Sequence, residues 1–328
     1  MAETTHKPVY IIAEAGINHG GDLKVAAEMV GVAADAGIDA VKFQSFTAGG
    51  LTHSALAADQ HEFFAKYELS RDEHRELAGI CESHGVDFLS TPFDHGMAKM
   101  LNELGVRAFK IASCDLTNIP LIECCAAFDK PLFISTGMGS VDEVKQAYNA
   151  ARNAGNGKVT MLQCTTNYPT AYTDVNLGAL KVMREAVGCS VGFSDHSIGN
   201  WACFGAAALG AEVIEKHFCL DKSASGPDIP GSCGPDELKD LVQGIRSLTE
   251  CLGSGDKVMR ASEREVAVIA RRSIYYARDI RAGQTLQSGD FICLRPAGGM
   301  SPARLGELMG RALKRDVKAG DTAQPDDV

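Results

Sequence analysis

The chain has 328 residues, of which 45% are hydrophobic and 23% charged, values typical of a soluble globular protein large enough for one big domain and a smaller one. Its net charge of −10 argues against nucleic acid or an anionic membrane as the main partner, because either requires a basic surface. The 11 cysteines include no C-x-x-C pair, so we expect reduced core thiols rather than a structural zinc site.

Targeting and membrane segments are not expected. The first residues, 1–8, are short and polar, without the apolar stretch of a secretory signal. No apolar run reaches the roughly 18 residues that a membrane helix requires. We therefore expect a cytoplasmic protein.

Residues 1–255 repeat one pattern, in which a short apolar run is followed by a polar turn and an amphipathic helix. The eight apolar runs lie at 9–13, 40–43, 87–89, 108–111, 132–134, 159–162, 189–193 and 211–214. The helical stretches follow at 23–36, 71–84, 96–104, 120–128, 141–154, 177–185, 200–209 and 235–252, with Asp22 and Ser140 as N-caps of two of them. Eight strand–helix units in this length predict a (β/α)8 TIM barrel.

An open, doubly wound sheet is the alternative fold. Such a sheet usually carries an early glycine fingerprint for dinucleotides, with the spacing G-x-G-x-x-G. The glycines after the first run, Gly16, Gly20 and Gly21, do not have that spacing. The barrel is therefore the preferred interpretation.

Polar side chains occupy the carboxyl end of every predicted strand, where TIM barrels place their active sites. These residues are Glu14, Lys42, Gln44, Ser90, Thr91, Lys110, Ser113, Ser135, Thr136, Gln163, Thr165, Thr166, Ser194, His196, Glu215 and His217. Surface exposure explains a polar residue at one strand end, but poorly at all eight. Period-two spacing puts Ser194 with His196, and Glu215 with His217, on common faces.

Two chemistries follow from this ring of residues. His196 and His217 end neighbouring predicted strands, so their imidazoles could hold one divalent metal; the alternative for each is a hydrogen-bonded structural histidine. Lys42 and Lys110, among hydroxyls, predict a cage for phosphate and carboxylate groups. The alternative for the lysines is pairing with glutamates across the barrel mouth, since an unpaired buried charge is costly.

After Gly253 the pattern changes. Residues 256–270 are read as a linker that includes a short helical turn, and residues 271–328 as a small β-rich domain. Strands are expected at 273–277, 279–283, 291–295 and 312–317, with a short helix at 302–308. The segments 277–283 and 314–321 resemble each other, which suggests an internal pseudo-repeat.

A series of motifs resembles the bacterial sialic acid synthase family over nearly the whole chain and in the same order. They are IAEAGINHGGD at 12–22, VKFQ at 41–44, STPF at 90–93, KIAS at 110–113, STGM at 135–138, GFSDHS at 192–197, EKHF at 215–218, GPD at 226–228 and RP at 295–296. Together these motifs are specific, although none is so alone.

The resemblance implies a TIM barrel followed by a small antifreeze-like (SAF) domain, in a homodimer whose SAF domains cap the barrel of the partner. It implies metal-dependent condensation of phosphoenolpyruvate with N-acetylmannosamine and water, giving N-acetylneuraminate and phosphate by C–O cleavage. Legionaminic or pseudaminic acid synthesis from a 2,4-diacetamido hexose is a second possibility. A non-catalytic carbohydrate- or ice-binding protein is a third, suggested only by the small C-terminal domain.

The resemblance also assigns roles to residues that match the family motifs. It implies His196 and His217 as ligands of a divalent metal, typically Mn²⁺, and Glu14 as the acid/base carboxylate, with Glu215 as a possible partner that orients a histidine. It implies a phosphoenolpyruvate cage of Lys42, Thr91, Lys110, Ser113, Ser135 and Ser194. It implies acceptor contacts from Gln44, Tyr168 and Asp228, with Arg295 reaching in from the other subunit.

Two departures from the family bear on the acceptor sugar. Residues 45–69 form a shorter segment than in the sialic acid synthases, where it supplies contacts on the sugar side. In the segment after the sixth strand, either Thr166 or Asn167 could face the ligand. The identity of the acceptor therefore stays open at this point.

Overall fold

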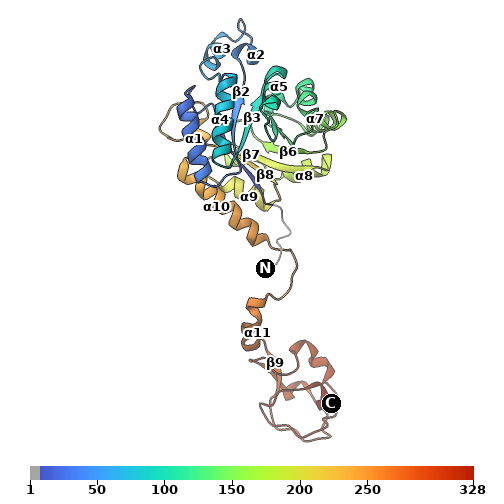
Figure 1. Cartoon of the computed structure of the whole chain (residues 1–328). Helices are drawn as coiled ribbons and strands as arrows, with labels where there is room; N and C mark the ends of the chain where they lie inside the picture. Colours follow the sequence, from blue (N-terminus) through green and yellow to red (C-terminus); the bar gives the residue numbers. More distant parts are fainter. Residues whose placement is uncertain (1–7) are drawn as a thin grey trace. The chain divides into compact units, whose positions relative to one another are not determined.

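The computed structural model describes residues 8–328, and the chain divides into two compact units, residues 8–254 and 255–328 (Figure 1). The polar start of the chain, residues 1–7, lies outside the described residues. Each unit is treated by itself below.

The first unit contains the eight predicted parallel strands, which form the predicted barrel. Their bounds are β1 Tyr10–Gly16, β2 Ala40–Ser45, β3 Asp87–Pro92, β4 Phe109–Ile111, β5 Leu132–Ser135, β6 Val159–Cys164, β7 Ser190–Asp195 and β8 Val213–His217. Hydrogen-bonded ladders run in the order β3-β2-β1-β8-β7-β6-β5-β4, and β3 contacts β4 without a ladder to complete the ring.

Helices surround the sheet on its outer side (Figure 1). The predicted ones are α1 Leu23–Asp35, α4 Arg71–Ser83, α5 His95–Glu103, α6 Ile119–Ala126, α7 Val141–Asn153, α8 Ala179–Val187, α9 Trp201–Ala208 and α10 Pro235–Leu252. Asp22 and Ser140 are N-caps as predicted, because their side chains accept hydrogen bonds from the backbone of Lys24 and Glu143. One large apolar cluster fills the space between strands and helices.

Two differences from the predicted elements matter for the site. Most strands run one to three residues beyond their predicted carboxyl ends, so most of the polar residues expected at these ends belong to the strands themselves. The exceptions, which follow the strands, are Ser113, Thr136, Thr165, Thr166 and His196. The segment 45–69 contains two unpredicted short helices, α2 Ala48–Leu51 and α3 Ala58–Phe64. These helices are held by tertiary contacts, because Phe46 lies edge-on to Phe64 and to Phe93. Such contacts cannot be predicted from the local sequence period.

The barrel interior is layered because side chains alternate along each strand. The lower layer is apolar and consists of Ile12, Ala40, Leu89, Ala108, Phe133, Leu162 and Val213. Gly192 completes this layer, where a Cβ would lie 2.4 Å from Leu162 Cδ2 and 2.6 Å from the Val213 carbonyl oxygen. The layer above, nearer the carboxyl ends of the strands, carries the predicted charges and hydroxyls.

A buried polar network fixes the outer face of β2 and β3. The Ser45 hydroxyl lies 2.7 Å from His74 Nε2 and 2.6 Å from the Ser90 hydroxyl. His74, on α4, donates from Nδ1 to the Ser70 carbonyl at 2.8 Å and is completely buried. These bonds hold the strand backbone beside Gln44 and Thr91, two of the predicted site residues.

The second unit, residues 255–328, is a small β-rich domain with its own apolar core. It contains α11 Arg264–Ala270, the antiparallel pair β9 Ser273–Tyr276 and β10 Phe291–Leu294, and a 3-10 helix at Pro302–Glu307. The predicted strands at 279–283 and 312–317 are wrong. Those segments are joined to other segments only by single bridges, such as Ile280 with Val317, because the chain turns too sharply there for longer ladders.

The predicted pseudo-repeat in this domain is reflected in equivalent side-chain contacts of its two halves. Arg278 pairs with Asp290, and Arg315 pairs with Asp327 at the equivalent position of the second repeat. The exchange between repeats is reciprocal: the Ala282 amide donates to Asp316, and the Ala319 amide donates to Asp279. Side-chain bonds of this kind supplement a core of few residues.

Two further expectations concern membrane-spanning helices and the state of the cysteines. None of the helices in residues 8–328 has the length and apolar character needed to cross a membrane. All 11 cysteines are free in the structure, as expected for reduced thiols.

The His74 network generates a prediction about stability and pH. Burial lowers the pKa of His74, so the folded protein keeps the ring neutral below pH 6.5, where the unfolded chain takes up a proton. Stability from the neutral ring is complete above pH 6.5 and is lost as the pH falls, by up to about 1.4 kcal/mol per pH unit. The stability deficit of His74→Gln relative to wild type should therefore be larger at pH 7.5 than at pH 5, measured by urea unfolding.

The matched control for this experiment is Ser90→Ala. It removes a hydroxyl of the same network but no titrating group, so its deficit should be nearly equal at the two pH values. A His74→Gln deficit that does not change with pH would show that the ring is not held neutral by the fold.

Candidate active site

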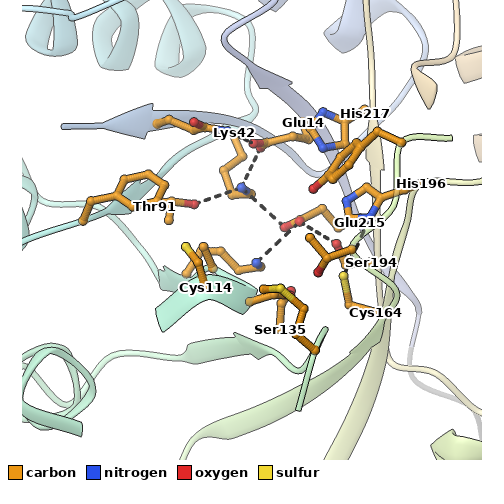
Figure 2. A pocket seen from close by; sticks show the side chains of 18 residues that line it. Glu14, Lys42, Thr91, Cys114, Ser135, Cys164, Ser194, His196, Glu215 and His217 are labelled. Carbon is orange, nitrogen blue, oxygen red and sulfur yellow. Dashed lines mark hydrogen bonds and ion pairs between the residues drawn. The ribbon is translucent and has the colours of Figure 1, made fainter. Parts of the chain in front are cut away.

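A cavity of about 170 Å³ opens at the carboxyl ends of the barrel strands and collects most of the predicted site residues (Figure 2). The resemblance implies a direct role in catalysis or binding for thirteen residues. Eleven of these line the cavity: Glu14, Lys42, Gln44, Thr91, Lys110, Ser113, Ser135, Tyr168, Ser194, His196 and His217. Because these residues come from all eight strands or the turns directly after them, the barrel alone brings them together. The apolar lower layer closes the cavity from below.

A chain of four alternating charges crosses the cavity floor. Lys42 Nζ lies 2.6 Å from Glu14 and 3.7 Å from Glu215, and Lys110 Nζ lies 3.6 Å from the other oxygen of Glu215. All four side chains are at most 6% exposed. In Figure 2, dashed lines join Lys42 to Glu14 and to Glu215.

The pKa values of these groups follow from burial and from their neighbours. Burial raises the pKa of Glu14 to about 7, and the like charge of Glu215 adds to this against the pull of Lys42. Burial opposes the charge on Glu215 too, but Lys110 and Lys42 outweigh it and lower its pKa. Burial also lowers the pKa of Lys110, which has a single carboxylate partner. Glu14 is thus the group of the four that can exchange a proton near neutral pH.

Hydroxyl groups stand around the two lysines. Thr91 accepts a hydrogen bond from Lys42 Nζ at 3.0 Å, and Ser194 donates to Glu215 at 3.0 Å. Ser113 accepts from the Gly137 amide at 3.0 Å. The buried Ser135 hydroxyl has no hydrogen-bond partner among the described residues. Two ammonium groups with free and exchangeable hydroxyls form a site suited to an anion such as phosphate.

The two histidines face each other across the upper part of the cavity. Their ring centroids are 5.2 Å apart, and the Tyr168 ring lies 4.0 Å from His196 and 5.6 Å from His217. His196 donates from Nδ1 to the Thr165 carbonyl at 2.8 Å, which leaves Nε2 without a proton in the neutral ring. Burial, together with the nearby positive charges, lowers the pKa of His217 well below its usual value.

These rings suit a metal with two protein ligands. Buried His217 Nδ1 has no hydrogen-bond partner within residues 8–328, and the backbone contact of His196 presents Nε2 for coordination. No cluster of three or more His, Cys, Asp or Glu side chains in the same residues could hold a metal ion. A metal held by these two imidazoles would have most of its coordination positions open to water and substrate oxygens.

Two predicted contacts, Asp228 and Arg295, do not line the cavity. Asp228, after β8, lies beside the cavity, with Oδ2 3.7 Å from His217 Nδ1. Gly16, whose φ of 53° marks a bulge in β1, leaves room between Asp228, Glu14 and Gln44, where a Cβ would lie 3.3–3.4 Å from each. Arg295 belongs to the second unit, follows β10 and is exposed.

Glu215 does not orient a histidine, which corrects one of the possibilities above. Its partners are Ser194, Lys42 and Lys110, because an inward residue of β8 two positions before His217 lies one layer deeper in the barrel. Of the two residues left open after the sixth strand, Thr166 lines the cavity.

Five cavity residues were not predicted: Phe93, Ala112, Cys114, Met138 and Cys164. Cys164 was detectable, since it continues the inward alternation of β6 after Leu162, and its sulfur lies 3.8 Å from His196 Nδ1. The others lie in turns after the strands, and their direction depends on loop conformation. Met138, for example, has a φ of 62°, a left-handed conformation that is uncommon outside glycine and cannot be predicted from the sequence pattern.

Comparison with known proteins gives a consistent result. The sequence profile of the NeuB family matches residues 29–257, and that of the SAF domain matches residues 271–328. Two N,N'-diacetyllegionaminic acid synthases are each 39% identical to the chain: that of Legionella pneumophila over 95% of this chain and 92% of its own, and that of Campylobacter jejuni over 95% and 98%. A solved N-acetylneuraminic acid synthetase from Leptospira borgpetersenii is 35% identical, with a TM-score of 0.76 over 79% of this chain and 90% of that chain.

The charge network generates a prediction about Lys42. Replacing it in Lys42→Met leaves Glu14 and Glu215 buried without their shared counter-ion, which should lower the free energy of unfolding by about 3–5 kcal/mol at neutral pH. Adding Glu14→Gln should restore part of this loss. Urea unfolding of the three proteins measures both effects.

Lys222→Met is the matched control, because Lys222 pairs with Glu237 at a similarly short distance, 2.7 Å, but on the surface. Its loss should stay below about 1 kcal/mol. If Lys42→Met costs as little as Lys222→Met, the four charges do not act as one buried network.

Proposed function

Because this chain belongs to the NeuB family, whose relatives above are synthases of sialic-acid-type sugars, we propose that it condenses phosphoenolpyruvate with an N-acetylated hexose and water. The products are a nine-carbon 2-keto sugar acid and phosphate. The observation that carries the proposal is the pairing, in one cavity, of a lysine-and-hydroxyl anion site with two facing imidazoles. The first suits phosphoenolpyruvate, and the second suits the metal-assisted activation of an aldehyde.

Phosphoenolpyruvate is assigned to the lower part of the cavity. Lys42 and Lys110 provide fixed positive charge, and Thr91, Ser113, Ser135 and Ser194 provide hydroxyls for its phosphate and carboxylate oxygens. Both lysines already pair with glutamates, so the bound anion must share or replace those partners. Two ammonium groups converge on this part of the cavity, and Glu14, whose pKa is raised to about 7, can lose its charge there, which favours an anion over a cation.

His196 and His217 are the proposed ligands of a divalent metal, with Mn²⁺ as the expected ion. When bound, it supplies Lewis-acid polarisation of the aldehyde oxygen of the open-chain sugar. The role of the two residues is to present imidazole nitrogens toward the cavity: in His196 the bond from Nδ1 to the Thr165 carbonyl turns Nε2 to the cavity, and in His217 burial lowers the pKa and keeps the ring neutral. Tyr168 packs against both rings and limits their rotation.

Bond formation then follows from the positions of the two substrates. The enol carbon of phosphoenolpyruvate attacks the aldehyde carbon, and the aldehyde oxygen takes up a proton. The carbon bearing the phosphate becomes oxocarbenium-like and adds water, whose proton leaves to a base. Glu14 is suited to this proton exchange because its pKa is raised to about 7. The C–O bond to phosphate breaks as the new hydroxyl loses its proton, which yields the keto group.

Two acceptors are candidates, and Gln44, Tyr168 and Asp228 are the proposed sugar contacts. N-acetylmannosamine would give N-acetylneuraminate, in line with the Leptospira borgpetersenii relative. A 2,4-diacetamido hexose would give a legionaminic-type acid, and the 39% identity to two legionaminic acid synthases favours this second candidate. Since phosphoenolpyruvate is a metabolite of the cytoplasm, we place the reaction there.

We also propose a homodimer in which the SAF domain of one subunit caps the barrel of the other. The reason is chemical: residues lining the barrel cavity include no arginine, and Arg295 is an exposed guanidinium on the SAF domain beside a family motif. An arginine from the partner would complete the acceptor site with a strong hydrogen-bond donor. The SAF domain would then serve catalysis rather than ice binding.

The proposed reaction predicts a strict co-substrate requirement. Phosphate release should need phosphoenolpyruvate, an acetamido hexose and Mn²⁺ together, and a chelator should reduce it to background until Mn²⁺ is restored. A panel of free and phosphorylated mono- and diacetamido hexoses, read by the mass of the keto-acid product, identifies the acceptor. With phosphoenolpyruvate labelled by ¹⁸O in the bridging position, the label should leave with phosphate. Full turnover in chelator would contradict the metal role.

The proposed capping predicts complementation between two inactive variants. Arg295→Ala should lower kcat about 10–100-fold without unfolding the barrel, and Lys110→Ala should be inactive. Equal mixing and reassociation should restore about a quarter of wild-type activity, since half of the dimers would carry one intact site. Arg311→Ala, another exposed arginine of the SAF domain, should keep normal turnover. Absence of complementation would argue for capping within one chain or for none.

A further inference from the structure

A second ion pair lies directly behind the two histidines, on the outer face of the sheet. Asp195 and Lys216 are the neighbours of His196 and His217 in sequence, and alternation along β7 and β8 turns them away from the cavity. Lys216 Nζ lies 2.7 Å from Asp195 Oδ2. Each side chain is 1% exposed, so the pair is fully removed from solvent.

Every hydrogen of the Lys216 ammonium has an acceptor. Besides Asp195, Lys216 donates to the carbonyl oxygens of Ser197 and of Gly199, the latter at 3.0 Å. Both carbonyls belong to the turn that follows His196. A lysine on β8 therefore holds the turn that leaves β7, and it uses all three of its donors to do so.

Both carboxylate oxygens of Asp195 also have hydrogen-bond donors. Its Oδ1 accepts from the Ser197 amide at 2.9 Å, and its Oδ2 accepts from Lys216 and from the Cys203 thiol of α9 at 3.3 Å. The carboxylate thus closes a tight turn across His196 while the lysine ties that turn to the residue before His217.

A buried ion pair is a poor way to gain stability alone, because its desolvation costs about as much as its attraction returns. Outward positions in the other strands are filled mainly by apolar side chains that pack against the helices. The Asp195–Lys216 pair lies at the carboxyl ends of β7 and β8, where the distance between the two strands sets the distance between the histidines. An apolar pair would fill the same space, but it would not bind the Ser197 and Gly199 carbonyls.

We propose that Asp195 and Lys216 are a positioning pair that holds the His196 and His217 imidazoles at the separation needed to bind a divalent cation. This inference rests on the proposed function, in which those histidines are the metal ligands. Neither residue touches substrate, and both act through the backbone of the histidine next to them.

The test compares Mn²⁺ affinity with thermal stability in the full-length protein. The variant Asp195→Asn/Lys216→Met removes both charges, so that no unpaired charge remains buried, and the single variant Lys216→Met accompanies it. Mn²⁺ binding is measured without substrates from the EPR signal of the free ion. We expect the Mn²⁺ dissociation constant to rise about 10–100-fold, the usual effect of losing a group that supports metal ligands.

The matched control is Asp39→Asn/Arg246→Met. It removes an ion pair of the same length, 2.7 Å, that ties the backbone near the amino ends of β1 and β2 in the same barrel. This control should lower the melting temperature but leave the Mn²⁺ affinity at the wild-type value. The contrast separates positioning from a general loss of stability.

The outcomes distinguish the inference from the proposed function. If wild type and the double variant bind Mn²⁺ equally well, the positioning role is wrong even if the enzyme turns over. If the control weakens Mn²⁺ binding as much as the double variant does, the effect is general destabilisation and the inference is also wrong. If wild type binds no Mn²⁺, the metal role and this inference both fail, whereas absent turnover with normal Mn²⁺ binding overturns the proposed reaction alone.

Discussion

The structure of the site depends on one chain of buried ion pairs, Glu14–Lys42–Glu215–Lys110, on top of an apolar layer inside the barrel. None of these charges would be tolerated alone, because desolvation is too costly. Their alternation makes the set nearly neutral, and Glu215 is central because it serves both lysines. The same arrangement keeps two cations ready for an anionic ligand in a cavity closed to water from below.

The layer above the ion pairs has a different character. His196, His217 and Tyr168 form an aromatic group over the charges, and burial lowers the pKa of His217, so that this ring brings a coordinating nitrogen without adding charge. On the outer face of the sheet, two buried polar groups lie beside site residues: the Ser45–His74–Ser90 network beside Gln44 and Thr91, and the Asp195–Lys216 pair beside the histidines. The site is therefore built from both faces of the same sheet.

The C-terminal domain is stabilised in a different way from the barrel. Its apolar core is small, and single bridges take the place of two of the four predicted strands. The duplicated Arg–Asp pairs and the reciprocal bonds between the repeats at Asp279 and Asp316 compensate for this by fixing the turns. In the proposed dimer, such a rigid domain is suited to presenting Arg295 to another subunit.

The sequence by itself determined the eight strand–helix units, the caps at Asp22 and Ser140, and the polar ring at the strand ends, because alternation, helical period and capping are local properties. It also indicated the family, since the motifs occur in order along the chain. Only the tertiary structure decided that Glu215 serves the lysines rather than a histidine, that Thr166 lines the cavity, that Phe46 anchors two short helices, and that Lys216 reaches the turn after His196. Each of these depends on which strands are neighbours and on their register, and such contacts join residues too distant in sequence for any local pattern to record.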